Sequence, residues 1–83
     1  MKSYAVIFSY SVDHDVAVYL FDTEEEAKKL LSDSIVSMFI EEVKHQKCGL
    51  SYDISEDGLF GVLERHYLDR VARMEVRVGR VYL

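Results

Sequence analysis

The chain has 83 residues, of which 49% are hydrophobic, and it contains no proline and a single cysteine. Ten lysines and arginines stand against fifteen aspartates and glutamates, and the net charge of -5 argues against non-specific binding to nucleic acid or anionic membranes. A chain of this length is expected to form one domain, residues 1–83. Cys48 has no partner for an intramolecular disulfide, which favours a reducing cytoplasm. No apolar run approaches the roughly 20 residues of a membrane-spanning helix.

Two short runs near the N-terminus, residues 4–8 and 16–21, are rich in β-branched and aromatic residues. A mainly polar stretch, residues 11–15, separates them, so we expect the two runs to form a hairpin. Apolar residues occupy both alternating positions of both runs, which means that neither face of the hairpin suits free contact with water. A helix can cover one face, and self-association is a candidate cover for the other.

A long helix is expected to begin at Thr23. Thr23-Glu24-Glu25-Glu26 fits a capping box, in which the threonine hydroxyl accepts a hydrogen bond from the Glu26 amide. Helix propensity is expected to fall beyond Lys44, and the helix is expected to end before Gly49. Helical spacing defines an apolar stripe that packs on a sheet, made of Ala27, Leu30, Leu31, Ile35, Met38 and Phe39.

The same helix carries a second apolar group, Val36, Ile40 and Val43, which we call the helix stripe. A sheet on one side cannot cover it, and a helix that is apolar on every side is buried on every side. The helix stripe is therefore a candidate partner-binding site for a second copy of the chain or for another protein. The alternative is that Ser32-Asp33-Ser34 breaks the helix and lets its second half repack internally.

The second half of the chain is interpreted as a loop followed by another hairpin. We expect a loop from Gly49, a turn at residues 55–58, and strands at residues 59–67 and 71–83. Residues 62–74 also have helical spacing, so a helix there stays open. The predicted fold is α+β with the order ββαββ: two antiparallel β-hairpins form a four-stranded sheet packed on one long helix.

The segment 53–64 has the oxygen spacing of a calcium loop and resembles the EF-hand family over these twelve residues. Two features depart from that family, because Gly49 interrupts any incoming helix too early and Phe60-Gly61 suits a hairpin better than an exiting helix. The competing interpretation is a polar turn between the helix and a strand. The metal ligands that the resemblance implies are Asp53, Ser55, Asp57 and Glu64.

No arrangement in the sequence predicts catalysis. Acids adjoin histidines at residues 13–15 and 64–66, but neighbouring residues on a strand or turn point in different directions. His45 and Cys48 are two potential zinc ligands, whereas zinc needs three or four. We therefore expect no enzymatic activity and no cofactor.

Arg73 and Arg77 are the candidate contacts for a nucleic acid or another anion, with Tyr67 or Tyr82 available for stacking. The competing interpretation is a solvated face whose arginines pair with neighbouring acids. Because the chain as a whole is acidic, we favour the paired face and expect no nucleic-acid partner.

Segments 4–11, 16–27 and 77–82 resemble small uncharacterised proteins of gut Firmicutes and of their mobile elements. The resemblance spans most of the chain and carries no assigned activity. It implies a bacterial cytoplasmic setting and an accessory role, and no functional residue transfers with it.

These observations predict a small non-enzymatic interaction or regulatory module. It is expected to be a homo-oligomer or to bind a protein partner, through the helix stripe or through an exposed sheet face. One alternative is a calcium-binding module built on residues 53–64. The other is an inhibitor whose acidic surface occupies a basic site on a nucleic-acid-handling protein, and it rests on Glu24, Glu25, Glu26, Glu41 and Glu42.

Overall fold

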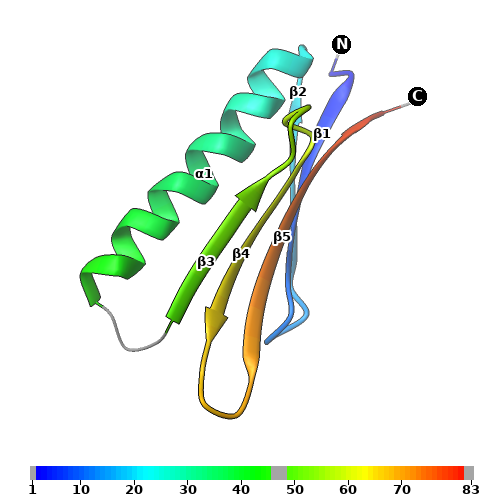
Figure 1. Cartoon of the computed structure of the whole chain (residues 1–83). Helices are drawn as coiled ribbons and strands as arrows, with labels where there is room; N and C mark the ends of the chain where they lie inside the picture. The colour runs from blue at the N-terminus through cyan, green and yellow to red at the C-terminus, as the bar shows by residue number, and fades with distance from the viewer. Residues whose placement is uncertain (1, 46–48, 82–83) are drawn as a thin grey trace.

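The computed structural model describes residues 2–45 and 49–81, and within them one helix and five strands follow one another (Figure 1). The strands form an antiparallel sheet in the order β2-β1-β5-β4-β3, so the first and last strands of the chain pair with each other. The elements are β1 (Tyr4–Tyr10), β2 (Val16–Phe21), α1 (Glu24–His45), β3 (Gly49–Ile54), β4 (Phe60–His66) and β5 (Val71–Arg80).

Helix α1 covers one face of the sheet, and the core lies between the two layers (Figure 1). Val6 and Phe8 of β1 and Val76 of β5 meet Leu31 and Ile35 of α1, and each of these side chains is at most 6% exposed. Successive side chains of a strand point to opposite faces, so it is alternate residues that reach the helix. Fully burying one such side chain contributes about 1.5 to 3 kcal/mol to the free energy of unfolding, and this burial holds the helix on the sheet.

The predicted start of the helix is confirmed. The Glu26 amide donates a hydrogen bond to Thr23 Oγ1 at 3.2 Å, and the Thr23 hydroxyl donates to Glu26 Oε1 at 2.9 Å. The alternative of a break at residues 32–34 is wrong, because α1 runs without interruption to His45. Lys29 forms an ion pair with Asp33 at 3.0 Å within that segment. Such i,i+4 pairs stabilise a helix, so residues that favour turns are tolerated there.

The predicted α+β class is correct, but the four-stranded ββαββ sheet is wrong, because residues 49–54 form a fifth strand where we expected a loop. Leu50, Tyr52 and Ile54 alternate with polar residues and point to the side of the sheet that α1 covers. There the Tyr52 ring packs on Phe39 with centroids 4.7 Å apart. β3 is an edge strand, and its residues on the face away from α1 are polar. Its extended conformation depends on pairing with β4, and the composition of residues 49–54 does not reveal that pairing.

The helical alternative for residues 62–74 is also wrong, since this segment forms most of β4, a turn and the start of β5. The Tyr67 amide donates to the Arg70 carbonyl at 2.8 Å and closes that turn. Three strands in sequence therefore follow the helix, and among residues 2–45 and 49–81 no second helix covers the other face of the sheet.

Candidate functional site

The sheet face opposite α1 has no covering element among residues 2–45 and 49–81 (Figure 1). Strand register places Ile7 of β1 opposite Val18 of β2 on this face, with Val16 and Leu20 on either side. The exposed fractions are 37% for Ile7, 62% for Val16, 54% for Val18 and 50% for Leu20. We call these four residues the sheet stripe. Four adjacent aliphatic side chains in water form an exposed apolar patch, which is a feature typical of binding surfaces.

The same two strands are apolar on their other side as well. There Phe8 and Tyr19 meet edge to face, with ring centroids 5.6 Å apart. Packing on α1 accounts for Phe8, which belongs to the buried core, and for Ala17 and Phe21, which pack against it, whereas Tyr19 is 52% exposed. The helix does not account for the sheet stripe, which lies on the opposite side.

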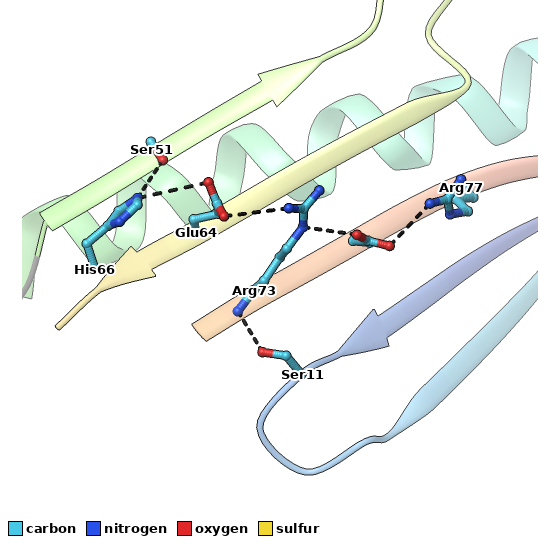
Figure 2. A network of polar contacts seen from close by, with 7 residues as sticks. Ser11, Ser51, Glu64, His66, Arg73 and Arg77 are labelled. Carbon is cyan, nitrogen blue, oxygen red and sulfur yellow. Dashed lines mark hydrogen bonds and ion pairs between the residues drawn. The ribbon is translucent and has the colours of Figure 1, made fainter. Parts of the chain in front are cut away.

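A row of polar side chains crosses the uncovered face over β3, β4 and β5 (Figure 2). Nε2 of His66 lies 3.0 Å from Ser51 Oγ and 4.0 Å from Glu64 Oε1. Arg73 follows, with Nη1 3.7 Å from Glu64 Oε2 and Nε 3.0 Å from Glu75 Oε1. The other oxygen of Glu75 lies 3.3 Å from Nη2 of Arg77. We call this row the polar ladder, and its members are Ser51, His66, Glu64, Arg73, Glu75 and Arg77.

The polar ladder contains a serine, a histidine and a glutamate without the geometry of a catalytic triad. In a triad, the hydroxyl and the carboxylate contact opposite nitrogens of the imidazole. Here Ser51 and Glu64 both approach Nε2 of His66. The carboxylate therefore does not orient the imidazole toward the serine, and this arrangement does not support nucleophilic catalysis.

Arg73 and Arg77, the candidate anion contacts, both belong to the polar ladder. Arg73 contacts two carboxylates, and Arg77 contacts Glu75 and stacks over the Phe60 ring at 4.6 Å. A phosphate would have to displace carboxylates that already neutralise both guanidinium groups. Tyr67 lies in the turn after β4 and stacks with Arg70, and Tyr82 is outside the described residues.

The helix stripe lies on the part of α1 that faces away from the core. Val36 is half-buried, whereas Ile40 and Val43 are 53% and 38% exposed. Charged residues lie between them on the helix, where Lys44 and Glu41 form an ion pair at 3.6 Å. The helix stripe is therefore a smaller apolar surface than the sheet stripe and a more highly charged one.

The structure does not bring the four predicted calcium ligands together. Asp53 lies in β3, Glu64 lies in β4 within the polar ladder, and Ser55 and Asp57 build the turn between the two strands. The Ser55 hydroxyl donates to Asp57 Oδ1 at 2.7 Å and the Leu59 amide donates to the same oxygen at 3.0 Å, and these bonds hold the pKa of Asp57 below its usual value. No group of three or more potential ligands able to hold a metal ion occurs among the described residues. We do not propose a calcium site.

The acids behind the inhibitor alternative form two separate groups, one at each end of α1. Glu26 belongs to the capping box, and Glu24 pairs with Lys28 at 2.9 Å. Glu42, near the other end, pairs with Arg65 of β4. Positions 26 and 42 are about 24 Å apart along a helix that rises about 1.5 Å per residue. The helix therefore does not offer one continuous acidic surface.

The polar ladder was not predicted from the sequence. Charges at alternate positions of β5 were visible in it, but the register that joins them to His66 and Glu64 arises only when β4 pairs with β5. The sheet stripe left a clearer signal, because both alternating positions of β1 and β2 are apolar.

Comparisons of this chain with protein-family models, with curated proteins and with solved structures find no match. In the described part of the chain, no helix is long and apolar enough to cross a membrane. The function is therefore inferred from the surfaces described above.

Proposed function

We propose that this protein is a non-enzymatic interaction module that forms a homodimer through the uncovered face of its sheet. The observation that carries this proposal is the sheet stripe, Ile7, Val16, Val18 and Leu20, which lies in water with no covering element among the described residues. Removing apolar surface from water is worth about 25 cal/mol per Å², so a partner that covers the stripe is favoured.

The size of the uncovered face supports a second copy as the occupant. Five strands about 4.8 Å apart, with about seven residues each at about 3.3 Å per residue, give a flat area of about 550 Å². Stable interfaces take about 600 to 1,000 Å² of accessible surface from each partner. The relief of the side chains adds to the flat area and brings the face into that range.

The distribution of charge also supports this interface. Each copy has a net charge of -5, so two copies repel each other unless they meet where the charge is low. In the polar ladder, Glu64 and Glu75 are balanced by Arg73 and Arg77, while the acids of α1 lie on the opposite side of the sheet. A two-fold axis through the uncovered face lets the same surface serve both copies, as an isologous interface requires.

The helix stripe is the weaker candidate for this contact, since only Ile40 and Val43 of its three residues are exposed and ionised side chains separate them. Dimerisation through α1 would also bring the glutamates of two helices together. We further propose a cytoplasmic setting, which the single cysteine of the chain supports.

Sedimentation velocity tests the proposal. The wild-type protein is expected to shift from monomer to dimer between about 5 and 500 µM, which corresponds to a weak homodimer. Val18→Asp places a carboxylate in the centre of the sheet stripe and is expected to remain monomeric.

Leu68→Asp is the matched control, because it adds the same charge at a fully exposed residue in the turn between β4 and β5. It is expected to dimerise like the wild type. A wild-type protein that is monomeric throughout, or a Val18→Asp variant that dimerises as well as Leu68→Asp, contradicts the proposal. Circular dichroism shows whether both variants keep the native fold.

A further inference from the structure

A cleft of about 300 Å³ lies on the side of the sheet that α1 covers, between the second half of the helix and the far ends of β1, β4 and β5. The turn between β4 and β5 extends beyond the last turn of α1, so the helix does not cover this end of the sheet (Figure 1). The floor of the cleft is apolar. Met38 comes from α1, Leu63 from β4, and Ala72 and Met74 from β5, and the last three are nearly fully buried.

Two arginines that lie outside the polar ladder line the same cleft. The guanidinium group of Arg70 stacks over the Tyr67 ring at 5.0 Å and contacts no carboxylate among the described residues. Arg65 binds Glu42 through Nη2, while its Nε–H is buried without an acceptor in the described structure. Asp13 and Arg73 line the cleft as well, so its lining holds three arginines and one acid.

The arginines and the apolar floor of the cleft together favour one class of ligand. An unpaired guanidinium group binds a carboxylate through two parallel hydrogen bonds, which a neutral group cannot reproduce. A buried N–H without an acceptor costs free energy, so the Nε–H of Arg65 adds an unsatisfied donor beside the cleft. A volume of about 300 Å³ is at the lower end for ligand pockets, so it suits a small molecule.

We propose that this cleft binds a small organic carboxylate with an apolar body. The carboxylate lies against Arg70, and the body packs on Met38, Leu63 and Met74. The cleft and the dimer interface lie on opposite sides of the sheet, so this site goes beyond the proposed function and the failure of either proposal leaves the other standing. Tyr10 and Tyr67, which also line the cleft, add aromatic surface for a flat ligand.

Titration of the ¹⁵N-labelled full chain by NMR tests the site, with phenylacetate as the probe. Phenylacetamide has the same shape without the charge, and inorganic phosphate has the charge without the apolar body. Phenylacetate is expected to shift the amides of residues 10–13 and 63–74 and to bind about tenfold more tightly than either of the other two compounds.

Arg70→Gln is expected to weaken the binding of phenylacetate about tenfold. Arg77→Gln is the matched control, because it removes another arginine that stacks on an aromatic ring, on the other side of the sheet, and it is expected to leave binding unchanged. The proposal is overturned if phenylacetamide or phosphate binds as tightly as phenylacetate, or if the amide shifts fall outside residues 10–13 and 63–74. It is also overturned if Arg70→Gln and Arg77→Gln weaken the binding of phenylacetate equally. Arg70 is exposed, so its replacement is expected to preserve the dispersion of the spectrum.

Discussion

Gly61 of β4 lies where the strand passes closest to the helix. A Cβ atom at this position would lie 3.1 Å from Cγ1 of Ile35 and 3.1 Å from Cδ2 of Leu31. Carbon atoms in contact prefer about 3.5 to 4.0 Å, so the two side chains would have to move by a few tenths of an ångström. Both are 0% exposed and lie between helix and sheet, which leaves them little space for such a movement.

The replacement Gly61→Ala is therefore expected to destabilise the protein. Overpacking of a core costs about 1 to 3 kcal/mol, and alanine regains about 0.5 to 1 kcal/mol over glycine within a strand. The net loss is about 1 kcal/mol, which lowers the Tm of a domain of this size by about 4 to 8 °C.

Gly79→Ala is the matched control, because a Cβ atom at Gly79 meets nothing within 4 Å. It is expected to be neutral or slightly stabilising. Thermal and urea unfolding followed by circular dichroism, at a few micromolar protein, compares the two variants. If Gly61→Ala is as stable as Gly79→Ala, the close approach of helix and sheet at Gly61 is refuted.

The other predictions concern the helix start, the β3–β4 turn and the Glu42–Arg65 pair. Thr23→Ala removes the acceptor for the Glu26 amide and is expected to cost about 1 kcal/mol in urea unfolding, and an unchanged midpoint contradicts this role. The pKa of Asp57 is lowered by folding, so its contribution to stability is present above the ordinary value of 3.8 and is lost as pH falls through the lower folded value. The stability difference between wild type and Asp57→Asn is accordingly expected to be constant near neutral pH and to shrink below pH 3.8, whereas a difference that grows in acid has the wrong sign. A double-mutant cycle with Glu42→Gln and Arg65→Gln is expected to give a coupling of about 0.5 to 1 kcal/mol that weakens with salt, because both side chains are about one-third exposed.

Features that depend on near neighbours in the chain were predicted from the sequence. The capping box is an example, since Thr23 and Glu26 are three residues apart and their contact forms within one helical turn. The last strand, predicted at residues 71–83 and observed as β5, is another, because one side of that strand is buried and the other is solvated. In both cases the physical cause of the structure lies within a few residues, where a sequence pattern records it.

The two predicted hairpins are confirmed, because β1 pairs with β2 and β4 pairs with β5. The fifth strand and the registers between strands were not predicted. Strand β3 has only three apolar residues and lies at a sheet edge, so its conformation depends on pairing with β4. The polar ladder joins Ser51, Glu64 and Arg73 from three strands, and their proximity is set by two registers. The apparent calcium spacing at residues 53–64 was misleading for the same reason, because strand pairing carries Glu64 along β4 and away from the turn.

An isotope-filtered NOE experiment tests most directly whether the sheet stripe joins two copies of the chain. A sample mixed from ¹³C-labelled and unlabelled protein reports only contacts between different molecules. Intermolecular NOEs are expected from the methyl groups of Ile7, Val16, Val18 and Leu20. Intermolecular NOEs from Ile40 and Val43 in place of these, or none at all at a concentration where sedimentation shows a dimer, would contradict this expectation.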